Sequence, residues 1–294
     1  MVDSPDSRRA PDAPADDRSH SDEAFAFVRE LAGIMNRGHV ELPSFPAVAA
    51  RVIQVLNDPS ASAEQVVRVL GAEPALAART LLMANSIALN PAGHEIRDLR
   101  MGVLRVGFDV LRSAAVSFAM SQLKQARNYE GLEAQFAALW SRSSLVAATC
   151  YATAKEHRIF RPNNAMLAGL LHDVGRLYLF SQSGRYPALT RDPEGSRQVM
   201  DEWSPALGKA ILDNWNMAED MVAAVEHQND LDRDPEAPAD LADVVIVGKI
   251  LAGRMEDPGN ASPAILEELP SLRRLRLTPA ELDRIVDGSR EEIE

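Results

Sequence analysis

The feature that most constrains the fold is the spacing of the apolar residues, which recur every three or four positions from residue 42 onwards. Val48, Val52 and Leu56 show this spacing, which places them on one face of an α-helix. The period-two alternation of a half-buried strand is absent, and the β-branched run 244–247 lies inside a segment of helical length. Aromatic residues make up only 5% of the chain, so small and branched aliphatic residues must fill the core, which favours close-packed helices. We therefore predict an all-α fold.

Capping signals set the boundaries of several predicted helices. Ser62 and Gln65 have the spacing of a capping box, in which each side chain bonds the backbone of the other residue. Thr278 and Glu281 repeat this spacing, with a proline at the first helical position. The other predicted helices cover 22–33, 48–56, 74–85, 99–106, 109–123, 132–156, a segment containing His172-Asp173, 194–202, 205–214, 218–228, 239–255 and 262–268.

Composition and break signals divide the chain into four predicted parts. Residues 1–20 hold five Asp and three Pro and almost no large apolar residue, so we expect a disordered acidic tail. An N-terminal helical subdomain is predicted over 21–128 and a helical bundle over 129–256. A C-terminal helical extension is predicted over 257–294.

Charge argues against several classes of function. The chain has 31 basic and 43 acidic residues, whereas a broad DNA-binding face needs clustered Lys and Arg. The one compact basic cluster, Arg273, Arg274 and Arg276, is typical of a solvated helix face or loop.

Cys150 is the single cysteine and lies in an apolar stretch, so we predict a buried thiol. Neither a bilayer-spanning run nor a signal-peptide core is present, so we expect a cytoplasmic protein without a membrane partner.

The histidines are the first candidates for catalytic or metal chemistry. Four of them lie in the tail or beside loops and are predicted to be surface residues. These are His20, His39, His94 and His157. His172 differs, because it and Asp173 stand in an otherwise apolar stretch. Burying such a pair is costly unless both side chains have partners, and a hydrogen-bonded structural pair is about as common there as a pair of metal ligands.

The stretch Leu170–Arg176, Leu-Leu-His-Asp-Val-Gly-Arg, resembles the central motif of the HD superfamily of metal-dependent phosphohydrolases. Upstream segments narrow the resemblance to the HDOD domain, the HD-related output domain of bacterial signalling proteins. These segments are Leu42–Pro46, Val48–Pro59, Glu73–Leu76, Met83–Ser86, Ile96, Val106-Gly107 and Trp140–Ser143. The resemblance covers roughly residues 40–255. It implies that 129–256 is an HD-like helical bundle, with the N-terminal subdomain packed on it.

The resemblance also implies where metal ligands of a catalytic HD site would fall. The first histidine would fall at Arg142, whose guanidinium cannot bind a cation. Another would fall at Ser204, which we predict to be a helix N-cap followed by proline at the first helical position. His227 matches a further ligand. The final aspartate would fall near Gly248-Lys249, where the lysine adds a positive charge.

The residues left at the HD positions suit a structural network better than a metal site. His172, Asp173 and His227 remain, beside the added cations Arg142 and Lys249. Because a buried charge needs a partner, we expect Asp173 to pair with Arg142. We therefore predict no bound metal, no cofactor and no catalytic residue.

Two functions follow from this interpretation. The first is a non-catalytic signal-transduction or regulatory module of the HDOD type, which binds a protein partner or a small nucleotide, for example in a pocket between its two helical blocks. The alternative is a metal-dependent phosphohydrolase that acts on a nucleotide or a cyclic dinucleotide, and it rests on His172, Asp173 and His227 alone. Nucleic-acid binding through the arginine cluster is a weaker third option, because the net charge opposes it.

Overall fold

The structure is a computed structural model that describes residues 27, 29–35, 40, 42, 45–123, 130–158, 160–183, 185–186, 193–257 and 269–291. All regular elements in these ranges are α-helices, which confirms the all-α prediction. Four sequence predictions lie outside the described residues: the disordered tail, His20, His39 and the helix over 262–268.

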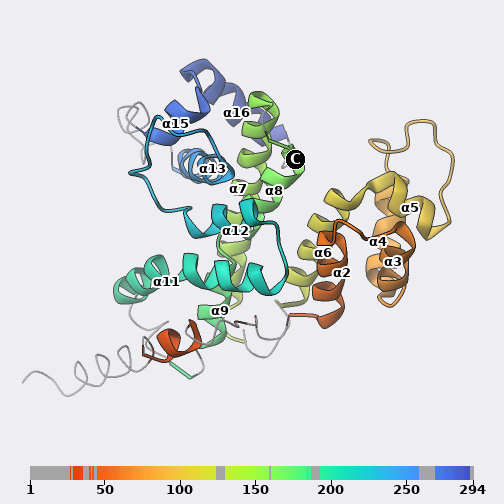
Figure 1. Ribbon diagram of the computed structural model, residues 1–294, viewed down its shortest axis with the longest axis horizontal. Helices are drawn as coiled ribbons and strands as arrows, with labels where there is room; N and C mark the ends of the chain where they lie inside the picture. Colours follow the sequence, from red (N-terminus) through yellow and green to blue (C-terminus); the bar gives the residue numbers. More distant parts are fainter. Residues whose placement is uncertain are drawn as a thin grey trace, which may run out of the picture.

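The helices form two lobes, which lie side by side in Figure 1. The N-terminal lobe, at the right, contains α2 (Ala47–Asn57), α3 (Ala63–Leu70), α4 (Pro74–Ala84), α5 (Leu99–Val106) and α6 (Phe108–Leu123). The C-terminal lobe contains α7 (Glu133–His157), α8 (Pro162–Leu171), α9 (Val174–Ser181), α11 (Pro193–Asn214), α12 (Glu219–Glu226), α13 (Leu241–Glu256), α15 (Pro270–Leu275) and α16 (Pro279–Glu291). The lobes meet where α6 packs on α8.

Both predicted capping boxes are present. The Ser62 hydroxyl accepts a hydrogen bond from the Gln65 amide at 3.2 Å, and the Gln65 side chain accepts one from the Ser62 amide at 2.7 Å. Thr278 and Glu281 make the same reciprocal pair at the start of α16, at 3.4 and 2.7 Å. These bonds satisfy amides that the first helical turn leaves without partners, which is why the two helices begin where they do.

The helical segment 29–35 lies against the C-terminal lobe, although it precedes the N-terminal lobe in the chain. The ring of Phe27 lies 4.8 Å from that of Tyr186, and Glu30 forms an ion pair with Arg185 at 2.6 Å. The ring of Phe45 then stacks on Trp215, immediately before α2 begins. In Figure 1 this segment is the short red-orange helix beside α9 and α11. The chain therefore crosses from the C-terminal lobe at the segment 29–35 to the N-terminal lobe at α2.

The helix α7 is the central element of the C-terminal lobe, and α8, α13 and α16 all pack on it. Cys150 lies at the α7–α13 contact, where its side chain is completely buried and its sulfur lies 3.6 Å from the Val244 carbonyl oxygen. Burial raises the pKa of the thiol well above its ordinary value. The prediction of a buried thiol is therefore confirmed.

The predicted helix start at Ser204 is wrong, because α11 continues without a break through Pro205. Proline inside a helix frees the carbonyl group four residues earlier, which here belongs to Asp201. The side-chain amide of Asn229 lies 3.4 Å from that carbonyl oxygen and donates a hydrogen bond to it. A partner from outside the helix thus helps α11 to tolerate the proline.

The prediction of a solvated arginine cluster is wrong for Arg274, whose side chain is only 5% exposed. Its Nε lies 3.2 Å from a carboxylate oxygen of Asp243, which is fully buried near the start of α13. Arg233 lies 3.3 Å from the other oxygen, and Ser271 donates a hydrogen bond to it. A buried carboxylate requires such partners, so α15 is fixed to α13. Only the other two arginines of the cluster are exposed.

Candidate functional site

Two glycines hold the His172-Asp173 pair between α8 and α9. A Cβ atom at Gly169 would lie 2.8 Å from the backbone of α7, and one at Gly175 would lie 2.0 Å from the Ser204 carbonyl oxygen on α11. Only glycine permits these two approaches. Because α8 is held on α7 and α9 on α11, the chain turns at the pair. The prediction of one helix running through His172 and Asp173 is therefore wrong.

His172 is buried, with 1% of its surface exposed. Its Nδ1 lies 2.7 Å from the Gly169 carbonyl oxygen, and because a carbonyl only accepts, this nitrogen carries a proton. Its Nε2 faces Asp173 at 3.4 Å, and Arg176 approaches the other carboxylate oxygen at 3.2 Å. Burial acts to raise the pKa of Asp173, but attraction to His172, Arg176 and Lys249 outweighs it and holds this pKa well below its ordinary value.

Lys249 brings an ammonium group to the same place. A Cβ at the preceding Gly248 would lie 2.6 Å from a side-chain atom of α7, so α13 approaches α7 closely there. The Nζ atom of Lys249 donates to the side-chain oxygen of Gln228 at 3.0 Å and to that of Asn229. Burial lowers the pKa of Lys249 to about 8, although the attraction of Asp173 opposes this shift.

Arg142 lies beside this group but does not contact Asp173. Its Nη2 donates to the backbone carbonyl of Lys249 at 2.9 Å, and its Nη1 forms an ion pair with Glu256 at the end of α13. The predicted Arg142–Asp173 pair is therefore wrong. Each side chain has a nearer partner, because Asp173 pairs with Arg176 one turn away on α9.

The inward residue after α12 is Gln228, not the predicted His227. The His227 side chain is 51% exposed and lies 4.0 Å from Glu226. Gln228 is 2% exposed, and its amide donates to the His172 carbonyl oxygen. Sequence reasoning missed Gln228 and Arg176. The spacing of three residues between Asp173 and Arg176 was the available signal for an ion pair on one helix face.

These donors do not fit the metal centre that an HD site implies. Catalytic zinc centres usually have three protein ligands. Among the residues that the structure describes, His172 and Asp173 are the two such donors in contact here, and the nearby Asp201 is paired with Arg176. Both face other groups already, and the charges of Arg176 and Lys249 would repel a cation. Within the described ranges, no three His, Cys, Asp or Glu side chains are grouped to hold a metal ion.

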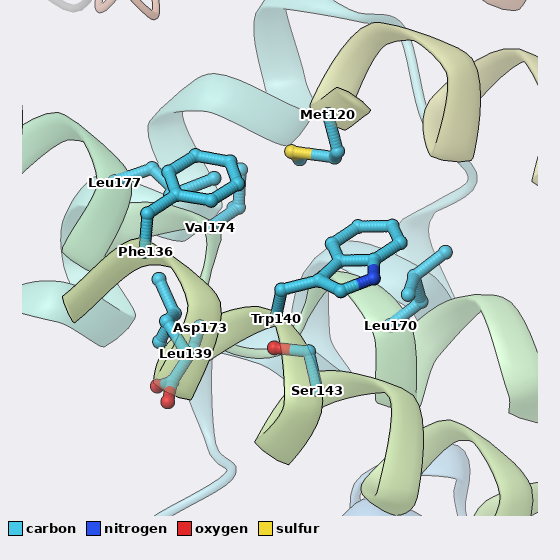
Figure 2. Close-up of a pocket in the computed structure, with 9 residues that line it drawn as sticks. All are labelled: Met120, Phe136, Leu139, Trp140, Ser143, Leu170, Asp173, Val174 and Leu177. Carbon is cyan, nitrogen blue, oxygen red and sulfur yellow. The ribbon is translucent and has the colours of Figure 1, made fainter. Parts of the chain in front are cut away.

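An apolar pocket borders Asp173 where the two lobes meet (Figure 2). Phe136 and Trp140 come from α7 and Met120 comes from α6, while the Asp173 carboxylate lies at the edge of this group. The enclosed space holds about one water molecule. This pocket is therefore too small for a nucleotide in the structure.

A larger cavity of about 520 Å³ lies between α2, the start of α6 and the start of α8. Arg112 and Arg161 line it together with Asp58 and Asp109. Asp109 pairs with both arginines, at 3.2 and 3.6 Å. The four charges balance, so the cavity wall has no net preference for an anion.

The chain is similar to a known protein family and to several solved structures. The model of the HDOD domain matches residues 42–231. A candidate metal-dependent phosphohydrolase from Shewanella amazonensis SB2B is similar, with a TM-score of 0.66 and 25% identity over 92% of this chain and 97% of that chain. An HDOD domain protein with unknown function from Geobacter sulfurreducens gives a TM-score of 0.60 and 24% identity over 90% and 94% of the two chains. No curated protein matches.

The family match extends from the approach to α2 to the loop after α12, and so includes both lobes and the His172-Asp173 turn. A candidate signal transduction protein from Marinobacter aquaeolei VT8 shares the fold, with a TM-score of 0.53 and 22% identity over 85% of this chain and 59% of that chain. Within the described part of this chain, no helix has the length and apolarity needed to cross a membrane. Because the HDOD family model matches well over half of the chain, the chain belongs to the HDOD domain family.

Proposed function

We propose that this HDOD protein is a non-catalytic regulatory module in signal transduction, which acts by binding a partner. The position of Lys249 is the observation that carries the proposal. Its ammonium group is held by Gln228, which also bonds the backbone of His172, and by Asn229. Its charge helps to lower the pKa of Asp173. A protein cation therefore stands close to the carboxylate that a metal ion would need. We call His172, Asp173, Arg176 and Lys249 the polar centre. Its negative charge is neutralised by side chains of the chain itself.

Protein binding is favoured over nucleotide binding for two reasons. The pocket beside Asp173 has room for about one water molecule. The larger cavity between the lobes has balanced charges, whereas a nucleotide phosphate needs an excess of positive charge. A partner protein would instead use the outer surface of the lobes.

The second candidate is a metal-dependent phosphohydrolase. The similar structure from Shewanella amazonensis is described as a candidate metal-dependent phosphohydrolase, at 25% identity. The His172-Asp173 pair of the superfamily motif is also present. These observations favour it over any other enzymatic function, and the ligand set described above opposes it.

The decisive experiment measures metal content and phosphoester hydrolysis on the same purified protein. The chain is incubated with Mn²⁺ or Mg²⁺, desalted and analysed for bound metal. It is then assayed with bis(p-nitrophenyl) phosphate, a nucleoside monophosphate and a cyclic dinucleotide. We expect less than stoichiometric metal and no turnover. Stoichiometric metal together with turnover that Asp173→Ala abolishes would overturn the proposal, whereas turnover that survives this substitution identifies a contaminating enzyme.

A further inference from the structure

Exposed apolar side chains are concentrated at one end of the N-terminal lobe. Across the described residues, five large apolar side chains are strongly exposed, and four of them belong to α4, α5 and the turn after α4. These four are Leu82 (73% exposed), Ile87 (89%), Met101 (49%) and Leu104 (52%). Figure 1 shows α4 and α5 at the outer end of this lobe, away from the C-terminal lobe. We call these four side chains the α4–α5 face.

The elements that carry the α4–α5 face are in direct contact. A Cβ at Gly102 would lie 3.2 Å from the side chain of Leu81, so α4 and α5 cross there. Leu82 follows Leu81 on α4 and Met101 precedes Gly102 on α5. Both are exposed, whereas Thr80 and Val103, on the other side of the two contacting residues, are buried. Arg105 donates to the Leu89 carbonyl oxygen at 3.0 Å, which joins the last turn of α5 to the turn after α4. The four side chains therefore belong to one small surface.

The segment that carries this surface is rich in arginine, although the protein as a whole is acidic. Residues 74–106 contain four arginines against two acidic residues, whereas the whole chain has 31 basic and 43 acidic residues. One of the two acids, Asp98, is used to cap α5. The same segment contains neither lysine nor an aromatic residue. The apolar side chains are thus bordered by guanidinium groups, which pair well with carboxylates.

The arginines at this surface are available to a partner. Arg100 pairs with Glu64 at 2.8 Å and Arg97 with Glu95 at 2.6 Å, but all four side chains are more than half exposed. Exposed pairs of this kind contribute little and exchange partners at small cost. Arg79 is exposed and forms no ion pair with any residue that the structure describes.

We propose that the α4–α5 face binds an amphipathic helix of a partner protein, with apolar residues at i, i+3, i+4 and i+7 and acidic residues beside them. This inference rests on the proposed regulatory function and supplies its partner class. Helices that lie on membranes carry Lys or Arg on one face and Trp, Phe or Leu on the other, and Trp and Tyr are enriched at the membrane interface. The absence of aromatic residues from 74–106 therefore favours a protein helix. A second copy of the chain fits less well, because a symmetric contact would bring the same arginines together.

The test selects helical peptides from a displayed library against the full chain without added metal. Selected peptides are synthesised, and their binding is measured by fluorescence anisotropy. We expect peptides with the apolar spacing and acidic flanks described above. The double variant Leu82→Ser/Leu104→Ser should weaken binding at least tenfold, and Arg79→Glu should weaken it and reduce its salt dependence. Leu231→Ser is the matched control, because Leu231 is 49% exposed but lies outside the face, and it should leave binding unchanged.

Three results would overturn the inference: no enrichment above the double variant, selected peptides that bind the double variant equally well, or binding of anionic phosphatidylserine vesicles that depends on Leu82 and Leu104. A concentration-dependent dimer lost in the double variant would assign the face to self-association and overturn it as well. Melting temperatures verify that each variant is folded. None of these experiments measures phosphoester hydrolysis. Failure of the docking inference can therefore be told apart from failure of the proposed function.

Discussion

Replacing Lys249 with methionine tests whether a buried ammonium group stands at the polar centre. Burial lowers the pKa of Lys249 from 10.5 to about 8 in the folded protein. Each factor of ten in proton affinity is worth about 1.4 kcal/mol, so the charge on Lys249 costs the folded state about 3 kcal/mol. The unfolded chain binds this proton more tightly. The cost is therefore complete below pH 8 and disappears above pH 10.5, and the stability contributed by this site rises between them.

The assay is urea unfolding of the native chain and Lys249→Met between pH 7 and 10.5. At pH 7 the variant removes the cost of the charge but leaves the buried side-chain oxygen of Gln228 without its donor, and an unsatisfied buried acceptor costs about 1–3 kcal/mol. The pH dependence is thus the cleaner quantity. The free energy of unfolding of the native chain, minus that of the variant, should increase by about 3 kcal/mol over this range.

Lys209→Met is the matched control for this experiment. Lys209 lies 2.8 Å from Glu226, and a hydrogen bond to this carboxylate raises the pKa of Lys209. A raised pKa stabilises the folded state at lower pH and loses this effect as the pH rises. Because the loss for Lys209 begins only near its unfolded pKa of 10.5, the difference between native chain and variant should stay almost constant for Lys209 up to pH 10.5 and increase for Lys249. A flat or decreasing difference for Lys249 would refute the buried ammonium group.

Three further predictions concern the centre and its helices. Asp173→Ala should lower the free energy of unfolding by about 3 kcal/mol at pH 7, because His172, Arg176 and Lys249 lose the carboxylate that attracts them. The folded state holds the pKa of Asp173 below 3.8, so this loss of stability should shrink as the pH falls below about 4. Urea unfolding at pH 7 and pH 3 measures it, and an equal loss at both pH values would contradict the prediction. Gly175→Ala should cost about 3 kcal/mol, because its Cβ would lie 2.0 Å from a backbone oxygen of α11. The control is Gly253→Ala, where the nearest atom to the new Cβ is 3.6 Å away, so the melting temperature should stay the same or rise. Equal effects of Gly175→Ala and Gly253→Ala would contradict the close approach of α9 to α11. Cys150 should react with a thiol reagent at pH 8 only as fast as the protein unfolds, because burial raises its pKa, and immediate labelling would contradict its burial.

Local signals in the sequence were sufficient for most helix boundaries. The capping boxes at Ser62 and Thr278 involve residues three positions apart, so the bonds that start these helices can be read without knowing the fold. The all-α class follows in the same way from apolar spacing. Pro205 shows where this reasoning stops: the side chain of Asn229 accommodates it within α11, and that residue lies 28 positions from the carbonyl it satisfies.

The site was less predictable, because side-chain partners depend on how the helices are rotated and packed. A difference of one residue at the end of α12 turns Gln228 inward and leaves His227 in solvent. Arg142 was expected to pair with Asp173, but the contact of α13 with α7 places Glu256 nearer to it. The sequence singled out His172 and Asp173, whose side chains lie 3.4 Å apart in the structure. It could not show that two glycines, Gly169 and Gly175, hold the chain in a turn there.

The position of the segment 29–35 on the C-terminal lobe has a consequence for biosynthesis. Glu30 bonds residues 155 and 156 positions later in the chain, and the backbone carbonyl of Val40 accepts a bond from Asn214, 174 positions later. A ribosome adds about 5–20 residues per second, so the start of the chain waits about ten seconds or more for these partners to emerge. Through that interval Phe27 and Leu31, both buried in the finished protein, have no native surface to cover them. The segment 29–35 therefore reaches its native place only after its partners in the C-terminal lobe, up to Asn214, have been made.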